Sequence, residues 1–427
     1  MLERLLGPAW VEVDLDHIAH NVRQVKQYIG VHCKLMAVVK ADAYGHGACE
    51  VAETALENGA EYLGVSSLAE ALELRSHGIQ APILVFTPLL QEELETALSA
   101  ELTLTVVDLA GAQRLNEAAM RRGIRQPVHV KVDTGMGRYG FGLGDLTAAV
   151  ERMREMRGLV LEGIYSHLAH GFRGRAGAPG CRAQAQRFLH ALEQLELAGH
   201  VFPLRHIASS GATLLLPQYH LDMVRCGNLI YGISPAGLPG DARDLGLKDA
   251  WRFRGRVAQI RELPAGTRVG YGGAVRLRRP MRTAVVPVGY ADGLGLAIDH
   301  APKSLLRKAG EWAKQKIKVM LYRLGLAGSM SIAISPVTYQ GISLPIVGRL
   351  SMQQVVVEIG DLPLETGAVV ELNARRSTVN PRLARLFLRA GKPYRIRSLA
   401  GSYELQGSEQ SIQPSARDAG KMRKAAW

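Results

Sequence analysis

Short apolar runs typical of buried strands recur eight times between about residues 30 and 230, and amphipathic stretches separate most of them. Most of those stretches end at a glycine, which commonly follows the last turn of a helix. Strands that alternate with helices pair in parallel, with both faces of the sheet covered. Eight such units close most naturally into a (β/α)8 TIM-like barrel of the α/β class. The runs are residues 35–39, 62–65, 82–86, 104–107, 127–132, 159–165, 205–208 and 222–226.

The pattern changes beyond about residue 240, where strand-like segments are separated by turns such as GDLP and ETG. We therefore expect the barrel over residues 1–240, followed by a mainly β second domain over 241–404. A basic helical insertion is expected near 299–320, and the polar segment 405–427 is expected to be a flexible tail. A doubly wound sheet is the structural alternative to the barrel, but no GxGxxG follows the first run.

The chain has 427 residues and a net charge of +13. A basic chain can bind nucleic acid. Aromatic residues make up only 6% of the sequence, however, and form no stacking ladder beside the basic segments. We therefore expect a basic solvated surface and no nucleic-acid partner.

The sequence also indicates where the protein works. No run of about 18 apolar residues is present, which predicts no membrane-spanning segment. The first residues have no apolar core and cleavage site of the secretory kind. The four cysteines are scattered without CxxC spacing, which is typical of free thiols in a reducing compartment. We expect a cytoplasmic protein.

Lys40 follows the first apolar run directly, at the end of the barrel that carries the chemistry in such enzymes. A lysine backed by apolar residues can have a lowered pKa and form a Schiff base with a carbonyl group. The alternative interpretation is a solvated lysine at the end of a strand, which is common.

Two loops after the seventh and eighth runs resemble an anion site. Ser209, Ser210 and Gly211 open a short helical stretch, and Gly227 and Asn228 follow the eighth run. Barrel enzymes often hold a phosphate here with loop amides and a helix N-terminus. The alternative is that the serines only cap a helix.

Four further polar residues lie at strand ends. Arg225 is the last charged residue of the eighth run, His167 lies at the end of the sixth, and either one alone is more often structural than catalytic. Lys131 and Arg138 flank a glycine-rich turn after the fifth run. Glycines allow a close backbone approach, and an arginine can bind a carboxylate with two parallel hydrogen bonds.

Seven segments now make a resemblance specific. They are VVKADAYGHG, KVDTGMGRYGFG, SSGAT, VRCGNLIYG, VGYGG, VPVGYADG and VGRLSM, in this order. Over about residues 10–400 the sequence resembles the alanine racemase family of fold-type III pyridoxal phosphate enzymes. The resemblance implies an isomerase that uses pyridoxal 5'-phosphate to interconvert L-alanine and D-alanine, which supplies D-alanine for peptidoglycan.

The resemblance also implies roles for single residues. Lys40 would hold the cofactor and act as one of two bases at Cα, with Tyr271 as the opposing base. Arg225 would face the pyridine nitrogen of the cofactor, held by His167. The residues that resemble the family's phosphate contacts are Tyr44, Ser210, Gly227, Asn228 and Tyr394.

The substrate side of the site follows in the same way. Arg138 resembles the arginine near the substrate carboxylate, and Lys131 resembles a lysine that braces it and is carbamylated in several family members. Met352 resembles the residue whose backbone amide meets that carboxylate. Tyr290 and Arg349 resemble residues of the entry channel.

The chemistry of racemisation fits these roles. It needs a base on each face of a planar carbanion, and the cofactor delocalises the negative charge. Arginine rarely gives up a proton, so Arg225 would leave the pyridine nitrogen unprotonated. A weaker electron sink should favour reprotonation at Cα over transamination. The resemblance further implies a homodimer in which Tyr271 reaches the site of the partner chain.

Two departures from the family leave the substrate more open than the fold. Gln353 stands where the family usually has an aspartate, and residues 295–345 form a longer segment than usual. The alternatives are a racemase of another small amino acid such as serine, and a non-catalytic pyridoxal-phosphate-binding protein on the same barrel. A decarboxylase of the related fold is disfavoured, because those enzymes pair the pyridine nitrogen with a carboxylate where this chain has Arg225.

Overall fold

The described part of the chain contains most of the segments discussed above. The segment expected to be a basic helix, 299–320, lies outside the described residues, and so does most of the expected tail, 405–427. A computed structural model describes residues 2–233, 245–295, 336–406 and 411–414.

One compact unit, the barrel unit, contains residues 14–250 and 388–392. Its strands are β2 (Lys34–Val38), β3 (Tyr62–Val65), β4 (Ile83–Val85), β5 (Thr103–Val106), β6 (Gln126–Lys131), β7 (Leu159–Tyr165), β8 (Leu204–His206) and β9 (Met223–Cys226). They pair in parallel in the order β8-β7-β6-β5-β4-β3-β2-β9. A parallel bridge between Ser209, three residues after β8, and Arg225 of β9 brings the two ends of the sheet together, so the sheet closes. The predicted eight-stranded barrel is confirmed.

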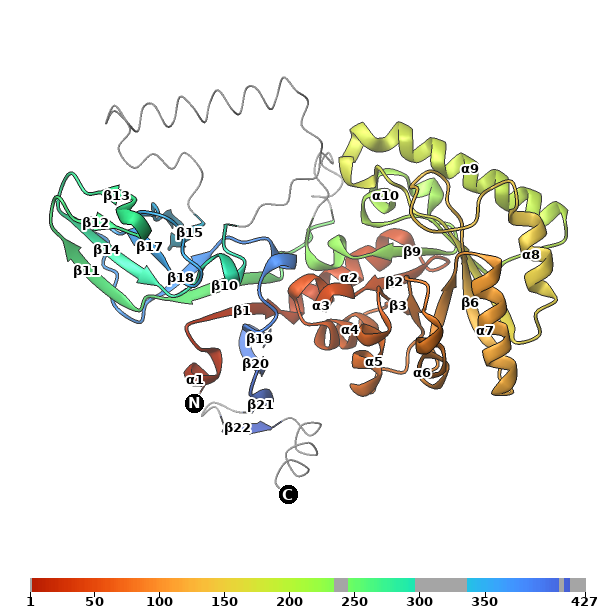
Figure 1. The fold of residues 1–427 in the computed structure, drawn as a ribbon, viewed down its shortest axis with the longest axis horizontal. Coiled ribbons are helices and arrows are strands. Elements are labelled where there is room, and N and C mark those ends of the chain that lie inside the picture. Colours follow the sequence, from red (N-terminus) through yellow and green to blue (C-terminus); the bar gives the residue numbers. More distant parts are fainter. Residues whose placement is uncertain (1, 234–244, 296–335, 407–410, 415–427) are drawn as a thin grey trace. The chain divides into compact units, whose positions relative to one another are not determined.

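Helices cover the outside of this barrel (Figure 1). Three of them, α2, α5 and α7, begin after a short polar residue whose side chain accepts from a free backbone amide; for example, Asp14 accepts a hydrogen bond from the amide of His17 at 3.0 Å before α2. Such a cap stabilises a helix by about 1 kcal/mol. The α-helices are α2 (Leu15–Ile29), α3 (Lys40–Gly45), α4 (Ala48–Glu57), α5 (Leu68–Ser76), α6 (Leu94–Ser99), α7 (Leu109–Arg121), α8 (Leu146–Arg154), α9 (Ala178–Leu197) and α10 (Ser210–Leu215). The 3-10 helices are η1 (Gln91–Glu93), η2 (Gly171–Gly177), η3 (Pro217–Tyr219) and η4 (Asn228–Tyr231).

The barrel has an apolar core between strands and helices and a mixed core inside the strands. The inner core contains Met36, Leu84 and Met223, which are fully buried. His129 and His206 are also fully buried. Polar groups can be buried at low cost only when they are hydrogen-bonded, so the inner core must contain a network of polar contacts.

The second compact unit, the β unit, contains residues 1–13, 251–387 and 393–427. Its strands are β1 (Ala9–Asp14), β10 (Trp251–Arg256), β11 (Gln259–Leu263), β12 (Arg268–Val269), β13 (Val275–Arg276), β14 (Met281–Val286), β15 (Val337–Tyr339), β16 (Ile342–Ser343), β17 (Val355–Glu358), β18 (Val369–Leu372), β19 (Ala384–Arg389), β20 (Lys392–Ser398), β21 (Gly401–Gln406) and β22 (Ser411–Pro414). Its helices are α1 (Leu2–Leu6), η5 (Tyr271–Gly273), η6 (Tyr290–Asp292) and η7 (Arg376–Thr378). One sheet has nine strands in the order β16-β15-β18-β10-β1-β19-β20-β21-β22, and two smaller sheets are β11-β14-β17 and β12-β13. The mainly β second domain is confirmed.

Both ends of the chain differ from the expected boundaries. Strand β1 pairs antiparallel with β10 from Ala9 to Val13, so the first residues belong to the β unit and not to the barrel. Near the other end, β21 and β22 pair with Leu405 opposite Ile412. This part of the expected tail is therefore a strand pair. No helix among the described residues has the length and apolarity needed to cross a membrane.

Candidate active site

The backbone after Lys40 has an unusual conformation. Residues 41–44 all have φ between 51° and 57°, which is the left-handed region. This conformation costs an L-residue about 1–2 kcal/mol. The amide of Ala41 donates to the carboxylate of Glu70 at 2.7 Å, which helps to hold the turn. Because the turn follows β2 directly, Lys40 and Tyr44 both line the same cavity.

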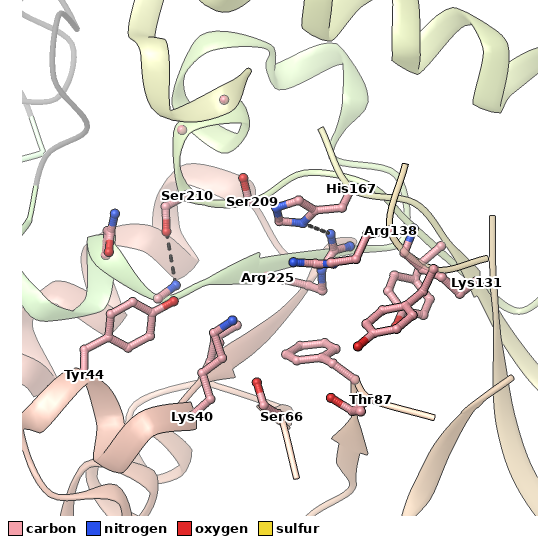
Figure 2. A pocket seen from close by; sticks show the side chains of 18 of the residues that line it. Lys40, Tyr44, Ser66, Thr87, Lys131, Arg138, His167, Ser209, Ser210 and Arg225 are labelled. Atoms are coloured by element: carbon pink, nitrogen blue, oxygen red, sulfur yellow. Dashed lines mark hydrogen bonds between the residues drawn. The ribbon is translucent and has the colours of Figure 1, made fainter. Parts of the chain in front are cut away.

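That cavity, of about 660 Å³, lies at the carboxyl ends of the barrel strands. Figure 2 shows its labelled side chains extending from several strands and loops toward the same space. Every residue of the barrel that the sequence analysis singled out for the site lines it: Lys40, Tyr44, Lys131, Arg138, His167, Ser210, Arg225, Gly227 and Asn228. The strand-end rule therefore brought together the residues that it selected.

The cavity lowers the pKa of Lys40 from its ordinary value. Burial lowers its pKa, and the positive charges of Arg138 and Arg225 lower it further, whereas Glu70 acts in the opposite direction. An amine with a lowered pKa is more often neutral near pH 7 and can act as a base or nucleophile.

Arg225 is buried, with 4% of its surface exposed. One terminal nitrogen donates to Nδ1 of His206 at 3.0 Å, and the other donates to the carbonyl of Ser166 at 2.8 Å and to Nδ1 of His167 at 3.2 Å. Burial lowers its pKa to about 10, so it remains a cation at neutral pH. The pKa of His167 and that of His206 lie well below the ordinary value because of burial and then Arg225. These three partners are therefore neutral acceptors.

Lys131 and Arg138 are connected through a glycine-rich loop. The carboxylate of Asp133 accepts hydrogen bonds from the amides of Gly135 and Gly137, both at 2.8 Å, which fixes the loop. Lys131 is buried and its pKa falls to about 7, first through burial and then through Arg225. Its Nζ donates to the next residue's carbonyl at 2.7 Å. The site therefore contains a second lysine that is easily deprotonated.

The part of the cavity away from Lys131 and Arg138 is built from hydroxyl groups and loop backbone. Oγ of Ser210 accepts from the amides of Gly227 at 3.1 Å and Leu229 at 3.4 Å, which leaves its own hydrogen available to donate (Figure 2). A Cβ on Gly227 would lie 2.9 Å from the hydroxyl of Tyr44, so any larger residue there would displace the Tyr44 ring. Burial raises the pKa of Tyr44, which therefore stays protonated and can donate. Such donors suit an anion.

The other five predicted site residues belong to the β unit. Tyr271 and Arg349 line one hollow of that unit, and Tyr271 is 78% exposed. The segments that carry Tyr290 and Met352 are joined through the backbone, because the amide of Tyr290 donates to the residue before Met352 at 3.1 Å. Both side chains are exposed. Tyr394 is half-buried in β20.

Some residues of the cavity were missed in the sequence. Ser66 and Thr87 line it directly after β3 and two residues after β4, and Tyr165 lines it at the end of β7. The ring of Tyr165 stacks on that of His206, with 4.8 Å between their centroids. The strand-end rule that selected Lys40 would have found them, because each one ends or follows a barrel strand.

Comparisons with known proteins agree with this arrangement. The family model described as "Alanine racemase, N-terminal domain" matches residues 13–235, and the model for the alanine racemase C-terminal domain matches residues 250–391. These two ranges contain all of the predicted site residues except Tyr394.

Relatives and solved structures give the same result. The chain is 40% identical over 364 residues to the alanine racemase of Desulfosudis oleivorans, covering 83% of this chain and 84% of that protein. It is 38% identical over 360 residues to alanine racemase 2 of Caldanaerobacter subterraneus subsp. tengcongensis, covering 84% and 83%. The alanine racemase structure of Clostridium difficile 630 superposes with a TM-score of 0.79 at 28% identity, covering 92% of this chain and 98% of that one. The chain belongs to the alanine racemase family.

Proposed function

We propose that the protein is a racemase that uses pyridoxal 5'-phosphate to interconvert L-alanine and D-alanine, and that it supplies D-alanine for peptidoglycan. The observation that carries the proposal is the convergence in one cavity of Lys40, Arg225 and the hydroxyl groups of Tyr44 and Ser210. The relatives named alanine racemase, which match over most of their length, support the same reaction.

The residues of the cavity fit this cofactor. Two arginines and two lysines line it, Arg138, Arg225, Lys40 and Lys131, and no aspartate or glutamate is among the described residues of its lining. Such a site suits a ligand that carries a phosphate and a substrate that carries a carboxylate. Lys40 would hold the cofactor covalently. Its phosphate would be bound by the residues that line the opposite part of the cavity, Tyr44, Ser210, Gly227 and Asn228, and by Tyr394 of the β unit.

Two bases would move the proton at Cα. When bound, the cofactor delocalises the negative charge that develops there. Nζ of Lys40 removes or returns the proton on one face of the carbon, which its lowered pKa favours. The phenol oxygen of Tyr271 acts on the other face. A general base of this kind contributes about 10²–10⁴-fold to a rate.

The arginines would orient the reacting groups. Arg138 binds the substrate carboxylate with its planar donor group, beside Lys131, and the amide of Met352 provides another donor. Tyr290 and Arg349 line the route by which the substrate enters. Arg225, with His167 beside it, would donate to the cofactor's ring nitrogen and would leave that nitrogen unprotonated, because a guanidinium does not give up its proton near neutral pH.

We further propose that the active protein is a homodimer whose sites are shared. Tyr271 is 78% exposed, yet a base that acts at Cα must be shielded from water to act selectively. A second chain that covers this face would supply the shielding, and two-fold symmetry would make both sites equivalent. All four cysteines are buried and none of them forms a disulfide, which supports a cytoplasmic protein.

The direct test is conversion of single enantiomers by purified protein, with and without added pyridoxal phosphate. Chiral chromatography of a panel of small amino acids would report the substrate. We expect L-alanine to be converted to D-alanine faster than serine or any other member of the panel, and only with the cofactor. Faster conversion of serine would reassign the substrate, and cofactor binding without any conversion would indicate a non-catalytic binding protein.

A further inference from the structure

A chain of hydrogen bonds crosses the barrel interior behind Arg225, and the proposed reaction does not use it directly. Arg225 contacts Nδ1 of His206 at 3.0 Å. Nε2 of His206 lies 2.8 Å from Nδ1 of His129, and Nε2 of His129 lies 3.2 Å from the carboxylate of Glu162. Two histidine side chains therefore connect the cation of the cavity to one carboxylate.

The direction of every hydrogen in this chain follows from its two ends. A guanidinium can only donate, and an ionised carboxylate can only accept. Nδ1 of His206 must therefore accept from Arg225, which puts the hydrogen of a neutral His206 on Nε2. That hydrogen points to Nδ1 of His129, so His129 also carries its hydrogen on Nε2 and donates it to Glu162. One tautomer of each ring satisfies all of these contacts.

The surroundings keep both rings neutral and the carboxylate ionised. Burial lowers the pKa of both histidines, and Arg225 acts in the same direction. Burial alone would raise the pKa of Glu162, but hydrogen bonds outweigh it and hold the pKa below its usual value. These bonds come from His129 and from the hydroxyl groups of Tyr62 at 2.8 Å and Thr103 at 3.5 Å.

The local fold is shaped for this contact. In the pairing of β6 with β7, Val128 lies opposite Leu161 but His129 lies opposite Gly163, so Glu162 is an extra residue in β7. Such bulges redirect a side chain. A Cβ on Gly163 would lie 2.7 Å from the ring of His129. The bulge and the glycine together give the ring its space beside Glu162.

We propose that Glu162 is a positioning residue that acts through His129 and His206 to present an acceptor nitrogen to Arg225. The proposal rests on the function proposed above, because it explains how Arg225 keeps one orientation as a donor in the cavity. Without an acceptor at the position of Glu162, the tautomers of both rings could reverse. Nδ1–H of His206 would then face an N–H of Arg225, and the guanidinium would have to turn away.

The test compares Glu162→Gln with Glu162→Met. His129, Tyr62 and Thr103 all contact the same carboxylate oxygen, Oε2 of Glu162, so the amide oxygen of glutamine can accept in its place, whereas methionine has a similar length and no oxygen. Solid-state ¹⁵N NMR of histidine-labelled protein without cofactor reports which ring nitrogen of His206 carries hydrogen. The signals are assigned by their loss in His206→Gln. The loaded enzyme gives a second readout, the ratio of pyruvate formed by transamination to alanine racemised.

We expect hydrogen on Nε2 of His206 in the wild type and in Glu162→Gln, with unchanged product ratios. In Glu162→Met a signal for Nδ1–H should appear and the ratio of pyruvate to racemised alanine should rise about tenfold, equivalent to about 1.4 kcal/mol. Tyr62→Phe is the matched control, because it removes another hydrogen bond to Glu162 and leaves the chain of histidines complete. Its tautomers and product ratio should match those of the wild type.

Three results would overturn the proposal. The first is hydrogen on Nδ1 of His206 in the wild type. The second is a Glu162→Met protein with unchanged tautomers and an unchanged product ratio. The third is an equal change in Tyr62→Phe, which would indicate a general loss of packing. A wild-type protein that shows the expected tautomers but no racemisation would instead contradict the proposed function, so the two failures are distinguishable.

Discussion

The two units of the chain treat their candidate site residues in opposite ways. In the barrel unit, Arg225 and Lys131 are 4% and 5% exposed and have fixed hydrogen-bond partners. In the β unit, Tyr271 and Met352 are 78% and 58% exposed. Buried polar groups with satisfied hydrogen bonds are held in place before a ligand arrives. Exposed side chains on a turn reach a similarly fixed position only when another surface covers them.

This difference divides the proposed work between the units. The barrel unit would bind the cofactor and determine how strongly its ring withdraws electrons, with side chains that are already positioned. The β unit would offer a surface whose chemistry depends on a second chain. Four experiments would break or sharpen this division.

The largest effect is expected at Lys40. Lys40→Ala removes the proposed base and the cofactor anchor together, so conversion of L-alanine to D-alanine should fall by about 10³-fold or more. Lys34→Ala, at the exposed start of the same strand, should keep full activity. In the wild type, borohydride reduction should make the bond between cofactor and lysine permanent. Peptide mapping should then locate that bond at Lys40. A label on Lys131, the other lysine of the cavity, would refute the assignment.

A mixed dimer tests the β unit. Lys40→Ala and Tyr271→Phe should each be nearly inactive alone. In a heterodimer of the two, a shared-site arrangement gives one site both defects and the other neither, so about half of the wild-type activity per dimer should return. The measurement needs heterodimers purified with two different tags. A heterodimer that stays inactive would mean that Tyr271 serves the site of its own chain.

A smaller effect is expected when the charge of Arg225 is reversed. Glutamate at this position would favour a protonated ring nitrogen and a stronger electron sink. In Arg225→Glu, racemisation should fall, while the ratio of pyruvate to racemised alanine should rise by at least about tenfold, equivalent to about 1.4 kcal/mol. Because the site is buried, circular dichroism and thermal unfolding must first show a folded protein. A folded variant with the wild-type ratio would remove Arg225 from this role.

The smallest effect concerns acid stability. His129 and His206 have lowered pKa values in the folded barrel because they are buried. The unfolded chain binds protons near a pKa of about 6.5, so their contribution is complete above that pH and is lost below it, by at most about 1.4 kcal/mol per pH unit for each histidine. The residues of the β unit that the structure describes include no histidine, whereas twelve of the chain's thirteen lie in the barrel unit. Hydrogen exchange at pH 7 and pH 5.5 should therefore show a larger loss of protection in barrel strands. Equal losses in both units would contradict this explanation.

Most of the barrel could be predicted because each strand leaves a local pattern in the sequence. The run at residues 159–165 coincides with β7, and the run at 62–65 coincides with β3. Strand β1 could not be assigned in this way. It pairs with β10, more than 200 residues away in the chain, and such a pairing depends on tertiary contacts that no local pattern records.

The residues of the candidate site could also be predicted where a local pattern marked them. Residues at strand ends were found, because parallel strands bring their ends together. The interior network was missed, although His129 lies two residues before Lys131 and therefore on the same face of β6. That spacing was a usable signal for His129. Glu162 reaches it only through a bulge in β7, and the sequence gives no indication of that extra residue.

The left-handed turn after Lys40 limits how this protein can be made more robust. Its four residues, 41–44, are all non-glycine residues in a conformation that glycine would adopt without a penalty. A screen that selects only for resistance to heat would therefore favour glycine at positions such as Ala41 and Ala43. The same substitutions would loosen the segment that connects Lys40 to Tyr44. Laboratory evolution of this enzyme should accordingly lower the turnover rate where it raises thermal stability at these positions. Libraries meant to keep both properties should leave this segment unchanged.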